Sequence, residues 1–344
     1  MNVLPPGVSA EQVDDAVALS GYPLQTVLER TLRGPFTVTP EWSYVDRESG
    51  ATRNMDLLAV KPLFDWAAPQ QLISPLLALL IECKRATLPY IFFETARPLR
   101  LNIEIAGVYP RSTIQISADD DLSHWNESFA TSLELSEEEF LSSGPAYAST
   151  FARINRAGNH LDLSGSDIFN NAVMPLIKAS DYLIDINMPR PSHRYYHPQL
   201  VVRVCVVDAP MLIFRQASEH AEITDWVRVL RHEIPVAPGH FNDAEVRPID
   251  FVHSDYLATY LSKFLMPFAE RFAERAAAHQ VELATGKGHV THSRTLRELS
   301  GLHAELRPRP RSSSIRHSLP VAVPLWLLGE ARSRLRGLVR RSER

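Results

Sequence analysis

The sequence predicts an α/β or α+β fold with a mixed central sheet flanked by helices, and two observations support this. Its periodic segments follow the order helix, strand, strand, strand, helix, strand, which combines a meander with one crossover connection. The run Leu76–Cys83 is short and almost wholly apolar, as is typical of a strand inside a sheet that is covered on both faces. A chain of 344 residues, 45% of them hydrophobic, can bury a large core in one large domain or two ordinary ones.

The first helix is predicted over Pro23–Leu32. Proline is favoured in the first turn of a helix, where its missing N–H costs nothing. Leucines then recur every four residues, which predicts one buried stripe along the helix. Gly34 and Pro35 end it, and residues 1–19 are expected to be a short lead-in.

Two strands after this helix are predicted to form a hairpin. They are Phe36–Val45 and Met55–Val60, and the turn between them is Glu48-Ser49-Gly50. Residues Pro62–Pro75 are expected to be a loop, and the apolar strand Leu76–Cys83 follows it. The core of the sheet is therefore expected early in the chain.

The remaining elements are predicted from the spacing of apolar residues. They are a helix over Ser166–Asn187, a second hairpin of Leu200–Val207 and Met211–Phe214, strands over Asp225–Ile234 and Val246–His253, and an amphipathic helix over Asp255–His279. Pro175 and Pro267 are expected to kink the two helices, because proline lacks the backbone donor and clashes with the preceding turn.

Charge is distributed unevenly along the chain. The net charge is -4, but residues 281–344 hold 13 Lys or Arg against 5 Asp or Glu, so the rest of the chain is strongly acidic. We therefore expect one domain over residues 20–280, with an insertion at about 100–165, and a flexible basic tail over 281–344. Such a tail can contact nucleic acid or an anionic surface, or it can serve only as a solubilising segment.

The sequence gives no sign of a membrane or secreted protein. It contains no apolar run long enough to cross a bilayer as a helix, and residues 1–12 lack the pattern of a secretory signal. Its two cysteines, Cys83 and Cys205, lie in apolar runs, which favours two buried thiols in a reducing compartment over a disulfide. A cytoplasmic protein is therefore expected.

The candidate chemistry lies at the end of the apolar strand. Alternation along a strand places Glu82 and Lys84 on one face, roughly 6.5 Å apart. Asp56, on the returning strand of the first hairpin, can bring a second carboxylate beside them. Two carboxylates can hold Mg²⁺ and leave positions for water, and the ammonium can orient or help to deprotonate one of those waters.

The first helix offers a third acid. Gln25 and Glu29 are spaced i, i+4 and share a face beside the leucine stripe. From there, Glu29 is expected to reach the metal from above the sheet.

These residues and this order of elements resemble the PD-(D/E)XK nuclease superfamily, which has the restriction-endonuclease-like fold. The resemblance covers about Ser20–Lys84 and, more loosely, Asp167–Phe214. It implies that the acids at 56 and 82 bind the metal, that the lysine at 84 serves the attacking water, and that the glutamate at 29 assists. The chain departs from the pattern at Met55, where the family often has proline, and between residues 85 and 187, which are long for the core.

The resemblance implies Mg²⁺-dependent hydrolysis of nucleic acid, with Mn²⁺ as a substitute ion. DNA is the favoured substrate and RNA the alternative, in prokaryotic restriction, phage defence or repair, with a homodimer or a partner subunit left open. Glu82-Cys83-Lys84 is the only acid-x-Lys triplet in a chain with 5 Lys and 31 Arg. Two other interpretations remain: a salt bridge that closes a strand end, and a non-catalytic binding module that keeps the nuclease fold.

A second candidate is the loop that contains Arg190, Arg194, Tyr195 and His197. Its basic and aromatic side chains could hold a strand of nucleic acid. The pair His193 and His197 lacks a nearby third ligand for a metal. The alternative is an ordinary exposed loop.

Overall fold

The computed structural model describes residues 2–64, 73–98, 101, 103–108, 113–118, 123–189, 196–215, 218, 220–233 and 245–290. The helices in this part of the chain are α1 (Ala10–Leu19), α2 (Tyr22–Leu32), α3 (Phe129–Ser132), α4 (Glu139–Ser142), α5 (Ser166–Ile168), α6 (Met174–Ile186), α7 (Leu257–Thr259), α8 (Met266–Ala278) and α9 (Gln280–Thr285). The strands are β1 (Thr37–Val45), β2 (Thr52–Pro62), β3 (Leu76–Arg85), β4 (Tyr90–Thr95), β5 (Glu104–Ala106), β6 (Thr113–Ala118), β7 (His124–Ser128), β8 (Ala146–Ala157), β9 (His160–Ser164), β10 (Gln199–Asp208), β11 (Met211–Phe214), β12 (Glu222–Ile223), β13 (Trp226–Glu233), β14 (Glu245–His253) and β15 (Lys287–Val290).

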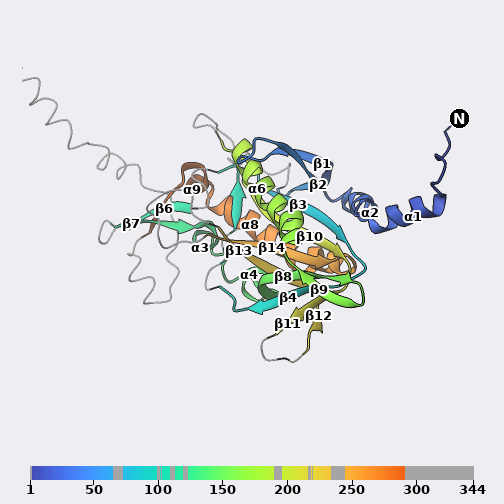
Figure 1. The fold of residues 1–344 in the computed structure, drawn as a ribbon. Coiled ribbons are helices and arrows are strands. Elements are labelled where there is room, and N and C mark those ends of the chain that lie inside the picture. Colours follow the sequence, from blue (N-terminus) through green and yellow to red (C-terminus); the bar gives the residue numbers. More distant parts are fainter. Residues whose placement is uncertain are drawn as a thin grey trace, which may run out of the picture.

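A large mixed sheet organises the molecule (Figure 1). Its strand order is β1-β2-β3-β10-β14-β13-β8-β4-β11-β12, with β5 beside β10 and β9 beside β8. The pairs β1–β2 and β2–β3 are antiparallel, whereas β3 and β10 run parallel over their whole length. The predicted mixed sheet with flanking helices is therefore confirmed.

Helices cover both faces of this sheet because its central strands are apolar on both sides. On one face, alternate residues of β3 and β10 pack with the leucines of α2 and with Phe268 and Phe272 of α8. On the other face, the intervening residues pack against α6 through Leu176, Ile177 and Leu183. Figure 1 shows α6 lying across the strands. The sheet is thus the middle of three layers.

The two long helices contain a wide turn before each proline instead of a simple kink. A π-helical turn, Phe169–Val173, precedes α6, and another, Tyr260–Leu265, precedes α8. Proline then occupies the first turn of each α-helical segment. In a π-helical turn the backbone hydrogen bonds join residues five apart. The turn is therefore wider just where proline lacks a backbone hydrogen-bond donor.

The structure corrects three expectations about the elements. Residues 1–19 contain a helix, α1, rather than only a lead-in. The prediction of a second hairpin is wrong, because β10 pairs with β3 and β14 whereas β11 pairs with β4 and β12. The start of the expected tail is folded: α9 leads to β15, which pairs with β6 in a small three-stranded sheet with β7. The rest of the tail, residues 291–344, lies outside the described residues.

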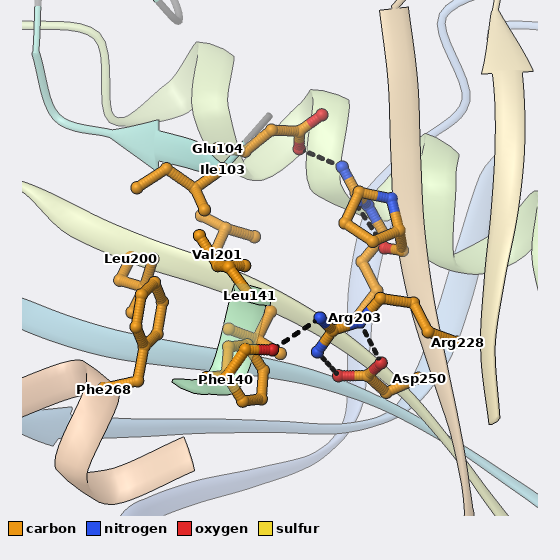
Figure 2. Close-up of a pocket in the computed structure, with 12 residues that line it drawn as sticks. Ile103, Glu104, Phe140, Leu141, Leu200, Val201, Arg203, Arg228, Asp250 and Phe268 are labelled. Atoms are coloured by element: carbon orange, nitrogen blue, oxygen red, sulfur yellow. Dashed lines mark hydrogen bonds and ion pairs between the residues drawn. The ribbon is translucent and has the colours of Figure 1, made fainter. Parts of the chain in front are cut away.

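Two buried ion pairs border a small cavity in the core (Figure 2). Arg228 binds both carboxylate oxygens of Asp250 at 2.7 and 3.0 Å, and the Tyr260 hydroxyl donates to the same carboxylate at 2.9 Å. Glu104 pairs with Arg203 on the opposite side. The cavity measures about 30 Å³, room for only a few water molecules, so it is too small for a substrate.

Candidate active site

The site begins where strands β2 and β3 stop pairing through their backbones. The ladder runs from Pro62 opposite Leu76 to Leu57 opposite Ile81. One residue further on, the side chain of Asp56 replaces the backbone acceptor: its Oδ2 accepts the N–H of Cys83 at 2.7 Å. This bond fixes the Asp56 carboxylate at the edge of β3.

Glu82 and Lys84 lie together on β3, as strand alternation predicts. The Lys84 Nζ donates to Oε2 of Glu82 at 2.7 Å. Only 5% of Glu82 is exposed, whereas Lys84 is half-buried. The carboxylate is therefore held below the surface, and the ammonium lies between it and solvent.

The carboxyl groups of Asp56 and Glu82 lie close enough together at this end of β3 for each to influence the pKa of the other. Burial raises the pKa of Asp56, and the Cys83 amide and Lys84 oppose that rise. Burial also raises the pKa of Glu82 to about 7, with Lys84 opposing and Asp56 adding to the rise. Glu82 therefore keeps a proton up to near neutral pH.

Lys84 remains an ammonium in this arrangement. Burial by itself lowers its pKa, but the neighbouring charges of Glu82 and Asp56 raise it above its ordinary value. A lysine in this state donates hydrogen bonds and does not accept a proton. Of the two roles considered for it, orienting a water fits this geometry better than deprotonating one.

Glu29 does not join this group, and the expected third acid from the first helix is corrected. It forms an ion pair with Arg33 along α2 instead. One turn earlier, roughly 5.4 Å along the helix, the buried Gln25 reaches the site. Its Nε2 donates to the backbone oxygen of Asp56 at 3.0 Å and to Oε1 of Glu41 at 2.9 Å.

Glu41 is the third acid that sequence reasoning missed. It lies on β1, where Pro40 pairs with Leu57 and Trp42 with Met55, so it is opposite Asp56. Its negative charge contributes to the raised pKa of Asp56. Its backbone φ of 50° is unusual for a residue with a side chain. Counting outward from the predicted turn Glu48-Ser49-Gly50 places Trp42 across from Asp56, one residue away from the observed register.

Gly21 packs directly against the site from the start of α2. A Cβ atom at this position would lie 3.0 Å from the carbonyl oxygen of Cys83, which is between Glu82 and Lys84 in sequence. Such a contact is too close for an ordinary side chain and backbone oxygen. The junction of α1 and α2 is therefore fixed against the strand that carries the site.

The basic and aromatic loop does not share this location. Arg190, Arg194 and Tyr195 lie outside the described residues. His197 is exposed and precedes the first residue of β10, whereas Glu82 is opposite Cys205 near the other end of that strand. Eight residues of strand correspond to roughly 26 Å, so His197 is at the opposite end of the sheet from the acid pair.

The cysteines are buried and free, as expected. Burial raises the pKa of both thiols, so neither Cys83 nor Cys205 forms a nucleophilic thiolate at neutral pH.

The donor set at this site fits a hard divalent cation. Asp56 and Glu82 offer carboxylate oxygens at the same strand end, and a cation can replace the proton that Glu82 keeps up to near neutral pH. Among the described residues, no group of three His, Cys, Asp or Glu side chains is arranged to hold an ion. Mg²⁺ commonly binds one or two carboxylates and takes its other ligands from water and substrate phosphates, so two acids suffice.

Within the described part of the chain, no helix has the length and apolarity needed to cross a membrane. Comparison with protein-family models, with curated proteins and with solved structures gives no match to this chain.

Proposed function

We propose that this protein is a Mg²⁺-dependent nuclease that hydrolyses phosphodiester bonds in DNA. The observation that carries the proposal is the placement of two acids at one strand end: Oδ2 of Asp56 accepts the Cys83 N–H at 2.7 Å, and Lys84 binds Glu82 at 2.7 Å. A salt bridge that merely closes a strand end would need one acid. A second, partly buried acid in the same place raises the energy of the empty site and favours a cation.

Each residue of the site would have a distinct task in this mechanism. Asp56 and Glu82 would hold the cation, and Lys84 would orient the attacking water by donating a hydrogen bond. The bound Mg²⁺ would stabilise the negative charge that grows on the scissile phosphate. Gln25 donates hydrogen bonds to the Asp56 backbone and to Glu41. It therefore keeps Glu41 beside Asp56, where the negative charge of Glu41 also favours a cation.

The topology supports the same proposal. Helix α2, strands β1, β2 and β3, helix α6 and strand β10 follow in the order that the resemblance to the PD-(D/E)XK nucleases implies. These strands are adjacent in the sheet, with β2 antiparallel to both of its neighbours. What this chain would share with those nucleases is the order of its elements and its site residues, so the activity needs its own test.

The test is cleavage of circular and linear DNA with Mg²⁺, by the parent and by variants at Lys84. Lys84→Ala and Lys84→Arg should each lower the rate roughly 100-fold or more, since the water loses its hydrogen-bond donor or meets one of different shape. Lys61→Ala is the matched control: Lys61 lies on β2 near its other end and should be dispensable. Circular dichroism and thermal unfolding confirm that each variant is folded.

Asp56→Asn separates metal binding from the role of Lys84. This variant should need a higher Mg²⁺ concentration, and Mn²⁺ should restore part of its activity, whereas neither ion should restore Lys84→Ala. A Lys84→Ala protein that cuts as fast as the parent would refute the proposed role of the lysine. A parent that binds DNA in Mg²⁺ without cutting it would favour the non-catalytic module.

A further inference from the structure

The first residues of the chain carry an unusual share of exposed apolar side chains. Of the sixteen large hydrophobic side chains that are exposed in the described residues, eight lie before residue 28: Val3, Leu4, Val8, Val13, Val17, Leu19, Tyr22 and Val27. Helix α1 has no buried residue, and Figure 1 shows it extending away from the sheet beside α2. A concentrated apolar surface of this kind marks an interface.

Helix α1 has a face that the described part of the chain leaves exposed. Ala10, Val13 and Val17 are spaced i, i+3, i+7 and share one side of the helix. Ser9 and Gln12 form a complete capping box, so the helix has a definite beginning. A helix of ten residues is nevertheless marginal in water unless its apolar face is packed. No residue of α1 is buried by the described residues, which leaves this face open to a second copy of the chain.

Helix α2 offers a complementary surface. Its inner face is buried against the sheet, but Tyr22 and Val27 on its outer side are 71% and 60% exposed. Arg30 lies beside Val27 and is exposed. The same chain therefore presents two apolar helix faces, one on α1 and one on the outside of α2.

The charges of these two faces are opposite. Helix α1 contains Glu11, Asp14 and Asp15 and no basic residue. The outer side of α2 contributes Arg30, while Arg33 is already paired with Glu29. The acids of α1 would repel nucleic-acid phosphates and an anionic membrane surface, but they suit the basic side of α2. Complementary charge and apolar area thus occur together on one chain.

We propose that two copies of this chain form a symmetric dimer in which α1 of each copy packs on the outer face of the other copy's α2. In a two-fold symmetric dimer the contact between α1 and α2 occurs twice, so the small apolar surfaces of both helices are used on both copies. The contact would use the exposed apolar side chains of α1 and of the outer side of α2, among them Val13, Val17, Tyr22 and Val27. This proposal is independent of the nuclease activity.

The first test measures the mass of the full chain by light scattering and analytical ultracentrifugation. The chain has a mass of 38.7 kDa, and the parent should show twice that mass at micromolar concentration. Val13→Asp with Val17→Asp should give a folded monomer, because neither side chain is buried within the chain. The matched control, Leu161→Asp with Leu163→Asp, changes two residues of β9 that are more exposed than Val13 and Val17, and this variant should remain dimeric.

The second test exchanges the charges. Asp14→Arg with Asp15→Arg should weaken self-association roughly tenfold, and Arg30→Glu should do the same, because each homodimer then faces like charges twice. Mixing the two variants should restore association, since both contacts in the heterodimer are again between opposite charges. A monomeric parent, a dimer insensitive to the changes at Val13 and Val17, or a mixture that does not re-associate would each overturn the proposal.

Discussion

The raised pKa of Glu82 connects the chemistry of the site with the stability of the fold. The pKa of Glu82 is raised from 4.5 to about 7. Between these pH values the unfolded chain has released the proton of this group, while the folded chain still holds it. Folding is therefore favoured by this group below pH 4.5, and that contribution is lost as pH rises to about 7.

Glu82→Gln should remove this pH dependence, because the amide does not titrate. Relative to the parent, the metal-free variant should gain on the order of 3 kcal/mol in free energy of unfolding as pH rises across that interval. Urea unfolding at several pH values measures the difference. Glu222→Gln, at an exposed position on β12, is the control, and parallel curves for the parent and Glu82→Gln would contradict the raised pKa of Glu82.

Strand alternation predicted the site residues that are local in sequence. Glu82 and Lys84 are two residues apart on one apolar strand, so their common face followed from the period of the strand. Glu41 was missed because its place beside Asp56 depends on hairpin register, which couples residues fifteen positions apart. The exchange of Glu29 for Gln25 has a similar cause: both share one helix face, and only the depth of packing decides which one reaches the sheet.

At the scale of elements, the apolar pattern predicted individual strands better than their partners. β10 and β11 were both expected, but β11 pairs with β4, more than a hundred residues earlier. Nothing in the sequence of the turn between β10 and β11 indicates that β11 pairs with the distant strand β4. Helix α1 was missed for the opposite reason: it packs on no part of the described sheet, so the main evidence for it was its capping box.

The buried ion pair between β13 and β14 is an element-scale feature with a measurable effect. Asp250→Ala would leave Arg228, which is 1% exposed, without its carboxylate and should cost roughly 3–5 kcal/mol in free energy of unfolding. Glu222→Ala breaks an exposed pair with Arg215 and should cost less than about 1 kcal/mol. Denaturant unfolding measures the free energy of unfolding of both variants. Equal losses would show that burial does not decide how much these ion pairs stabilise the fold.

At the scale of the whole molecule, an acidic body carries a basic segment. After Val290 the chain contains 12 Arg and 4 Glu. Because α9 and β15 belong to the folded part, a truncation that tests the basic segment must follow Val290 instead of starting at residue 281.

Truncation after Val290 should weaken binding to DNA of any sequence and reduce its dependence on salt, since fewer counterions are released from the phosphates. Fluorescence anisotropy with a labelled duplex at several salt concentrations measures both effects. The truncated protein should keep the unfolding temperature of the parent. Identical binding at every salt concentration would leave residues 291–344 as a solubilising segment only.

The bond from the Cys83 amide to Asp56 gives the site its own spectroscopic reporter. In a regular ladder this N–H would bond a backbone oxygen and would be insensitive to the ionisation of side chains. Here its acceptor is a carboxylate oxygen at 2.7 Å, so its nitrogen and proton chemical shifts must follow the charge on Asp56. A single cross-peak therefore registers both the ionisation of the acid pair and the arrival of a cation, in a sample that contains no nucleic acid.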